Sequence, residues 1–189
     1  MKKRITALFL CLALMLGCAA ATAETAETGR KGEMTVDGKF TIRWSEPEYY
    51  EMNNLQSDAE GLMIMTLTPD EEHQNQPMMT VCIALNEMYY DVERLNDLPD
   101  EELAILEDTF REEDEVEISY METDKGTRLL VAKEVRDGVD YVDFYTIYQG
   151  YEFELVMTQT RENAGTPITD AQIDTAVKFL SDLEFETVK

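Results

Sequence analysis

Three turn signals at regular intervals divide the second half of the chain into short apolar-rich runs. Asp124-Lys125-Gly126, Asp137-Gly138 and Gln149-Gly150 separate runs of about eight to ten residues, beginning near Val116. A short turn that contains glycine reverses the chain directly, so the runs on either side of it can pair as antiparallel strands. The spacing therefore predicts a meander of four antiparallel strands, which is the strongest constraint on the fold.

The first half of the chain carries two further hairpin signals. Asp37-Gly38 separates the apolar-rich segments 34–36 and 40–44, which predicts a strand, a tight turn and a second strand. Residues 61–68 and 78–85 are two more strand candidates, and the loop between them is polar and bounded by prolines. We expect these two strands to pair as well.

Two segments have the periodicity of amphipathic helices. Residues 99–102, Pro-Asp-Glu-Glu, suit a first helical turn, because proline is tolerated there and acidic side chains complement the positive end of the helix dipole. Thr169 and Gln172 have the spacing of a capping box. The apolar positions that follow share one face, namely Leu103, Leu106 and Phe110 in the first helix and Ile173, Ala176, Val177, Leu180 and Leu183 in the second. We therefore predict an α+β fold, an antiparallel sheet of about six to seven strands with two main helices packed on it.

The N-terminus has the composition of an export signal. Residues 2–4 are basic, residues 5–16 are apolar, and Ala21-Thr22-Ala23 supplies small residues at the −3 and −1 positions before Glu24. An apolar stretch of this length is too short to span a bilayer stably. Residues 1–23 are therefore predicted to be a signal peptide, cleaved between Ala23 and Glu24, and the mature protein is expected to act outside the cytoplasm.

The same region permits a second interpretation. Gly17-Cys18 directly follows the apolar stretch, as in bacterial lipoproteins, whose signal ends before a cysteine that becomes acylated. Met15 and Leu16 precede it, where that motif favours leucine and a small residue. In this alternative residues 1–17 are the signal and a lipid on Cys18 anchors the protein to a membrane.

Downstream of the signal, the chain suits one domain. Residues 24–33 contain no apolar residue larger than alanine and are predicted to be a flexible leader. Residues 34–189 are predicted to form a single α+β domain, because a segment of this length can bury most of its unfolded surface in one core.

Acidic residues dominate the composition. Forty Asp and Glu against 16 Lys and Arg give a net charge of −24 at pH 7, and loss of the three basic residues among 1–23 takes it to −27. Such a charge opposes contact with phosphate backbones and anionic lipids. We predict no nucleic-acid partner and no membrane contact other than a lipid anchor at Cys18. An unknown envelope protein or extracellular ligand is the expected partner, and the oligomeric state is left open.

The usual catalytic arrangements are missing from the sequence. The one histidine, His73, lies in a polar loop, and no serine lies in a Gly-x-Ser-x-Gly motif. Cys82 lies in a run that is apolar on both faces, which is typical of a small core residue rather than of a nucleophile. No zinc, phosphate-loop or dinucleotide motif is found, so we predict neither catalytic residues nor a cofactor.

Carboxylates leave chemical alternatives open. Asp137, Asp140 and Asp143 resemble a metal cluster, but on a strand Asp140 and Asp143 point to opposite faces. We therefore expect a turn residue and solvated strand positions there. The abundance of carboxylates still permits two alternative functions, a carboxylate-dependent hydrolase and a calcium-responsive structural protein.

Four tyrosines in neighbouring strands of the predicted meander are the candidate binding residues: Tyr141, Tyr145, Tyr148 and Tyr151. Tyrosine tolerates exposure and offers a large contact area, so the four can form a ligand platform. Cross-strand pairs of rings also stabilise sheets without any ligand. Both interpretations stay open.

The order of these elements resembles that of the PsbP-like family. Phe40-Thr41-Ile42, Pro47-Glu48-Tyr49 and the closing segment 176–185 carry the resemblance, with the hairpins, the mid-chain helix and the meander between them. The resemblance implies an antiparallel sheet flanked by helices over roughly residues 34–188. It also implies a bacterial envelope role, since exported lipoproteins are among the members, and it assigns no functional residue. We expect an exported, non-catalytic binding or accessory module of the cell envelope or the extracellular space.

Overall fold

The computed structural model describes residues 31–57, 62–111 and 116–188, which form ten strands and two α-helices. The first five strands are β1 (Lys31–Val36), β2 (Phe40–Ser45), β3 (Tyr50–Ser57), β4 (Met63–Pro69) and β5 (Met78–Leu85). The last five are β6 (Glu117–Glu122), β7 (Arg128–Arg136), β8 (Val139–Tyr148), β9 (Tyr151–Thr158) and β10 (Glu184–Thr187). The helices are α2 (Asp100–Phe110) and α3 (Asp170–Asp182), and the 3₁₀ turns are η1 (Glu87–Tyr89), η2 (Leu95–Asp97) and η3 (Arg161–Asn163).

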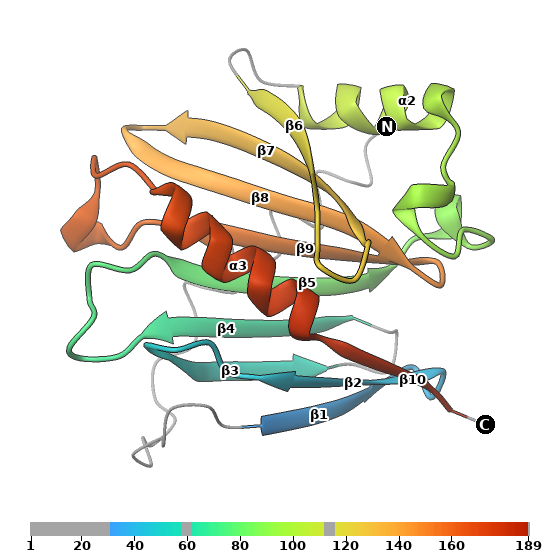
Figure 1. Ribbon diagram of the computed structural model, residues 1–189, viewed down its shortest axis with the longest axis horizontal. Helices are drawn as coiled ribbons and strands as arrows, with labels where there is room; N and C mark the ends of the chain where they lie inside the picture. Colours follow the sequence, from blue (N-terminus) through green and yellow to red (C-terminus); the bar gives the residue numbers. More distant parts are fainter. Residues whose placement is uncertain (1–30, 58–61, 112–115, 189) are drawn as a thin grey trace.

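The strands pair antiparallel in two sheets. The larger sheet has the order β3-β4-β5-β9-β8-β7-β6, and the smaller one has the order β1-β2-β10. Helix α3 lies across the larger sheet and leads into β10 of the smaller one (Figure 1). The predicted α+β fold, a sheet of seven strands with two helices, is confirmed. The separate three-stranded sheet is a feature that the sequence does not predict.

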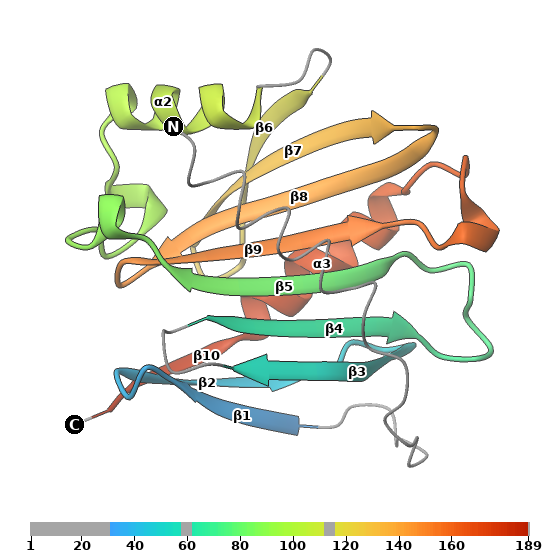
Figure 2. The ribbon, with the colours of Figure 1, turned by 180° about the vertical axis from the view of Figure 1, so that it is seen from behind.

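The larger sheet carries core side chains on both faces at β7 and β8. Figure 2, the view from behind, shows α3 on the far side of the sheet. Leu129 and Val131 of β7 join the core under α3, whereas Leu130 and Ala132 join a second core under α2. Because successive side chains of a strand point to opposite faces, the two helices cover opposite sides of the sheet.

Two of the predicted turns fix the register of the meander. Asp137 and Gly138 have φ angles of 51° and 78°, and Gln149 and Gly150 have φ angles of 50° and 81°. Positive φ at both central positions is the mark of a type I′ turn, whose twist matches that of the flanking strands. Pairing begins at the residues next to each turn. The meander β6 to β9 is thus confirmed.

Both predicted helices are confirmed, with one change at a helix end. The backbone N–H of Thr169 donates to Gln172 Oε1 at 2.8 Å, and the N–H of Gln172 donates to Thr169 Oγ1 at 3.4 Å, which completes the capping box of α3. Leu183 is predicted to lie on the apolar face of this helix, but α3 ends at Asp182. Leu183 instead adopts an extended backbone and directs the chain into β10.

The domain begins earlier than expected. β1 starts at Lys31, so residues 31–33 belong to a strand rather than to the leader 24–33. Gly32 lies opposite Trp44 of β2, and a Cβ at position 32 would lie only 2.3 Å from Cζ2 of the indole. Packing against the buried Trp44 therefore extends the pairing into a segment whose own composition is polar.

The predicted signal peptide, the alternative lipidation site Cys18 and the cleavage site between Ala23 and Glu24 lie outside the described residues. Within the described ranges, no helix combines the length and apolar character needed to cross a membrane.

Candidate binding groove at strand β10

The four candidate tyrosines lie on two different faces of the larger sheet. Tyr145 packs in the core under α2 and Tyr141 shares its parity on β8, whereas Tyr148 and Tyr151 pack on the side of α3. Tyr151 has no exposed surface, and Tyr145 is 4% exposed. The predicted platform of four side chains therefore does not form, because alternation along the strands separates them.

Tyr141 and Tyr145 are engaged by neighbouring side chains. The Tyr145 hydroxyl donates to Glu152 Oε1 at 2.7 Å, and its ring meets Phe110 of α2 edge-on with centroids 5.6 Å apart. The guanidinium carbon of Arg136 lies 5.4 Å from the centroid of the Tyr141 ring. These contacts give both tyrosines a role in packing the sheet.

Tyr148 and Tyr151 belong to an aromatic cluster between the two sheets, at the end of the molecule where the C-terminus lies (Figure 1). Phe40 of β2 meets Tyr148 and Tyr151 edge-on, with centroid distances of 5.3 Å and 5.1 Å. Phe185 of β10 stacks on Tyr148, with centroids 4.3 Å apart. Stacked and edge-on rings at such separations stabilise packing beyond the area that they bury.

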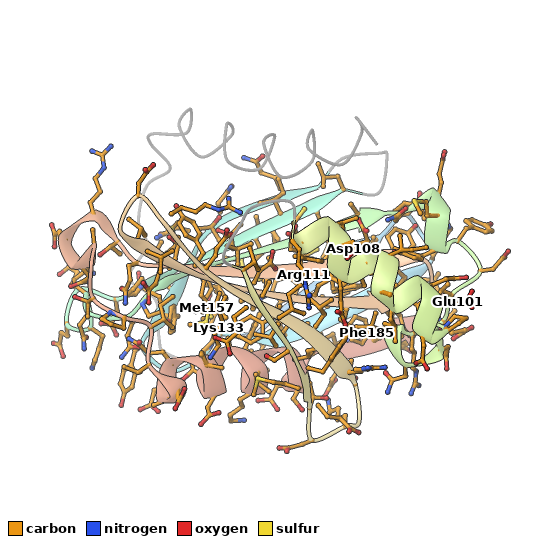
Figure 3. All side chains as sticks on the ribbon, turned by 90° about the horizontal axis from the view of Figure 1, so that it is seen from above. Glu101, Asp108, Arg111, Lys133, Met157 and Phe185 are labelled. Carbon is orange, nitrogen blue, oxygen red and sulfur yellow. The ribbon has the colours of Figure 1, made fainter. Side chains whose placement is uncertain are left out.

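The core under α3 is bordered at β10 by partly buried side chains, and we call this its open end. Met157 and Phe185 both contact it and lie toward opposite ends of the molecule (Figure 3). Met157 has no exposed surface, whereas Phe185 and Tyr148 are only half-buried. A groove of about 630 Å³ lies along β10 at the open end, and we call it the β10 groove. Its lining residues are Thr41, Phe185, Glu186, Thr187 and Val188.

Strand β10 is held by backbone pairing and by one bridging side chain. The N–H of Val188, just beyond the strand, donates to the Lys39 carbonyl at 2.8 Å. Arg43 of β2 donates to Glu186 at 2.7 Å and to Glu33 of β1 at 3.1 Å. These bonds, first that to Glu186, raise the pKa of Arg43 above its ordinary value. One guanidinium thus links all three strands of the smaller sheet.

A cation borders the same end of the molecule. Lys39 Nζ lies 5.2 Å from the centroid of the Tyr151 ring and 5.6 Å from that of Tyr90, distances at which cation–π attraction operates. Asp37 Oδ2 lies 3.6 Å from the same ammonium and accepts a bond from the Tyr151 hydroxyl at 2.8 Å. Chiefly through a hydrogen bond with Tyr151, the pKa of Lys39 is raised, so the ammonium stays charged.

Two exposed apolar side chains, Met88 and Tyr90, lie in the segment after β5, and Tyr90 borders this cation. Met88 and Tyr90 are each 64% exposed. Backbone bonds tie their loop to the β8–β9 turn, since the Gly150 N–H donates to the Val92 carbonyl at 2.9 Å and the Asn86 N–H donates to the Gly150 carbonyl at 3.1 Å. A Cβ on Gly150 would lie 3.0 Å from the Tyr90 carbonyl oxygen, so the contact requires glycine. The backbone therefore holds the two exposed side chains in a fixed place.

A second groove, of about 360 Å³, lies at the loop between β4 and β5 and is lined in part by Asp70. Asp70 Oδ1 accepts bonds from the backbone N–H groups of Glu72 and His73 and lies 2.7 Å from His73 Nδ1. Burial acts to raise the pKa of Asp70, but these bonds outweigh it and lower the pKa. The Tyr49 ring covers the His73 ring at 3.9 Å between centroids. The backbone of Tyr49 has a φ of 72°, which lies in the left-handed region.

Side chains from two other elements also hold the loop between β4 and β5. Asn163 of η3 donates to the Gln74 carbonyl, and Gln172 of α3 donates to the Asn75 carbonyl at 3.2 Å, so two distant elements hold the same loop. The contact between Asp70 and His73 was not predicted from the sequence. The signal that could have revealed it is the spacing Asp-x-x-His directly after a proline, which suits an aspartate that bonds to the N–H two or three residues later.

Two carboxyl groups meet on the face of the larger sheet opposite α3. Asp143 lies opposite Val156 and Glu154 lies opposite Tyr145, so the two acids are diagonal neighbours, and their side chains share a hydrogen bond. Burial raises the pKa of both, and the charge of Glu154 raises the pKa of Asp143 further. The two carboxyl groups therefore titrate together, at a higher pH than ordinary carboxyl groups do. Carboxyl groups in contact lack the separation of about 5 Å or more that glycoside hydrolysis uses.

The prediction that Asp140 and Asp143 point to opposite faces is confirmed, but the expectation of solvated strand positions is wrong for Asp143, which is buried beside Glu154. Asp140 Oδ2 accepts a bond from the Ile168 N–H at 3.1 Å, in the segment that leads into α3. The pair of Asp143 with Glu154 was missed, although the two-residue turn at Gln149-Gly150 fixes the register that brings them together. Across the described part of the chain, no three side chains of His, Cys, Asp or Glu are grouped to hold a metal ion. Cys82 is buried, as expected of a core residue.

Comparison with known proteins yields a likeness of fold. No family model matches the sequence, and no curated protein matches it. Among solved structures, the chain is similar to the solution structure of cyanobacterial PsbP from Synechocystis sp. PCC 6803, with 11% sequence identity over 88% of this chain and 98% of that one, at a TM-score of 0.44.

Proposed function

We propose that the protein is an exported, non-catalytic binding or accessory module of the cell envelope or the extracellular space, with the β10 groove as its contact surface. The observation that carries the proposal is the stacked pair of Tyr148 and Phe185, half-buried at the open end of the core beside the groove. Aromatic rings with one free flank are the side chains that most often anchor protein contacts. The groove lining of a ring, an aliphatic side chain, hydroxyls and a paired carboxylate suits contacts with another chain.

The export part of the proposal is supported by the basic, apolar and small-residue segments of residues 1–23. Its test is the intact mass of the protein isolated from its own host. We expect a chain that begins at Glu24 or, if the lipoprotein alternative holds, at Cys18 with an added lipid mass. A chain that keeps residues 1–23 would contradict export.

The binding part can be tested by site-specific crosslinking in the living host. A photoreactive benzoylphenylalanine at position 187, in the lining of the groove, should give one discrete crosslinked product. The same residue at position 174, an exposed site on α3, serves as the matched control and should give none. Equal products from both positions, or none from position 187, would count against the groove as the contact surface.

A further inference from the structure

One edge of β10 is unpaired among the described strands. Within the smaller sheet β10 neighbours β2 alone. Antiparallel strands exchange backbone bonds at alternate residues, and the bond from the Val188 N–H to the Lys39 carbonyl shows that the even-numbered residues of β10 face β2. The N–H and C=O groups of Phe185 and Thr187 therefore point away from β2, toward the free edge of β10.

The two faces of this edge differ in chemistry. On the inner face Phe185 and Tyr148 present half-buried rings. On the outer face Glu184 and Glu186 are exposed, and Glu186 is paired with Arg43. A strand added to β10 would place alternate side chains against the rings and the others beside the two carboxylates. Apolar residues suit the first set and basic residues the second, and the net charge of −24 favours a basic partner in the same way.

Two other sheet edges carry features that are less favourable for such a strand. β1 carries charges of both signs, Lys31 and Glu33, so it suits a strand of alternating apolar and basic residues less well than the two carboxylates of β10 do. β3 has a register shift between Met52 and Asn54, and a bulge of this kind interrupts the regular ladder. At β10 a groove with an aromatic wall accompanies the open edge instead.

We propose that the β10 groove binds an extended peptide segment of a partner protein, with alternating apolar and basic residues, which adds to β10 as a further strand of the smaller sheet. The inference rests on the proposed function as a binding module and names its ligand class. The outward backbone groups of Phe185 and Thr187 supply the hydrogen bonds, and the apolar residues of the peptide cover the rings of Phe185 and Tyr148.

The test uses the exported, processed protein and a defined probe, a blocked hexapeptide of alternating valine and lysine. Hydrogen exchange followed by NMR reports each backbone amide. We expect the peptide to bind and to slow exchange of the Phe185 and Thr187 amides at least about tenfold, with little change at Glu186, which already faces β2. A hexapeptide of alternating valine and glutamate should bind much more weakly. Binding without slower exchange at Phe185 and Thr187, or no binding up to about 1 mM, would overturn the proposal.

Two further measurements separate strand addition from general attraction to an acidic surface. Thr187→Pro removes one outward N–H and should weaken binding at least about tenfold, whereas Thr187→Val keeps the N–H and should not. If Thr187→Pro fails to fold, the wild-type protein is titrated with the valine-lysine peptide N-methylated at alternate residues, in two versions that block either set of donors. The version that is methylated at the N–H groups facing β10 should lose binding, and the version that is methylated at the other N–H groups should not. Equal binding of both versions would overturn the proposal.

Failure of this proposal is distinguishable from failure of the proposed function. A crosslinked partner at position 187, together with equal binding of both N-methylated peptides, would leave the binding module in place and remove strand addition as its mode.

Discussion

Tyr148 and Phe185 stack with ring centroids 4.3 Å apart, although one belongs to the larger sheet and the other to the smaller. The stack joins the two sheets at the open end of the core. We expect Phe185→Ala to lower the free energy of unfolding by about 2 kcal/mol, less than the 3–5 kcal/mol typical of a fully buried phenylalanine, because the ring is half-buried. Urea unfolding measures the change. Val188→Ala, at an exposed neighbouring site, should change stability by no more than about 0.5 kcal/mol.

Gly150 and Gly138 offer a matched pair of substitutions in type I′ turns. Both have positive φ, so alanine costs each turn about 1 kcal/mol of backbone strain. A Cβ at position 138 meets no atom within 4 Å, whereas at position 150 it would lie 3.0 Å from the Tyr90 carbonyl oxygen. Gly150→Ala should therefore destabilise the protein by about 1 kcal/mol more than Gly138→Ala and speed amide exchange at Asn86, whose N–H donates to the carbonyl of residue 150. Equal destabilisation would show that the contact with Tyr90 is not tight.

The capping box of α3 gives a third prediction. Thr169→Ala removes the side-chain oxygen that accepts the Gln172 N–H, and it should lower the free energy of unfolding by about 1 kcal/mol. Thr169→Ser keeps the hydroxyl and should restore most of the loss. Thermal or urea unfolding of the two variants measures the difference. A serine variant as unstable as the alanine variant would assign the effect to the methyl group of threonine rather than to the cap.

Local signals predicted the meander and both helices, because turn glycines, a capping box and apolar periodicity act within a few residues. Strands β3 and β10 were not predicted, because they depend on pairing with other strands rather than on local signals. β10 owes its existence to pairing with β2, far away in the sequence, and Leu183 continues a helical pattern although the helix ends at Asp182. β3 contains Asn53 and Asn54, which disfavour strands, and pairing with β4 overrides that preference.

The residues around the candidate groove were likewise predicted only in part. The sequence singled out Tyr148 and Tyr151, and both belong to the aromatic cluster next to the groove. Their partner Phe185 comes from β10, so the groove could not be found without the second sheet. The prediction that Tyr141 and Tyr145 share a surface with Tyr148 and Tyr151 was wrong, because the alternation of side chains along β8 places them on the other face.

The carboxyl pair of Asp143 and Glu154 gives the fourth prediction, a pH dependence of stability. Burial and the neighbouring Glu154 charge raise the pKa of Asp143 in the folded protein above its unfolded value. The folded state therefore binds a proton that the unfolded state has released, and this pair lowers stability progressively as pH rises from the unfolded pKa, about 4, through the folded pKa. The penalty is complete above the folded pKa and absent below about pH 4.

Asp143→Asn tests this account, because an asparagine amide donates to Glu154 without requiring a proton. We expect the stability of the variant relative to wild type to be greater at neutral pH than at pH 4, because the amide stays neutral without binding a proton. Asp174→Asn, at an exposed site on α3, should leave the pH profile of the unfolding free energy unchanged. A variant whose stability relative to wild type does not rise between pH 4 and neutral pH would contradict this account. The burial of Asp143 would then not be a source of the pH dependence of stability.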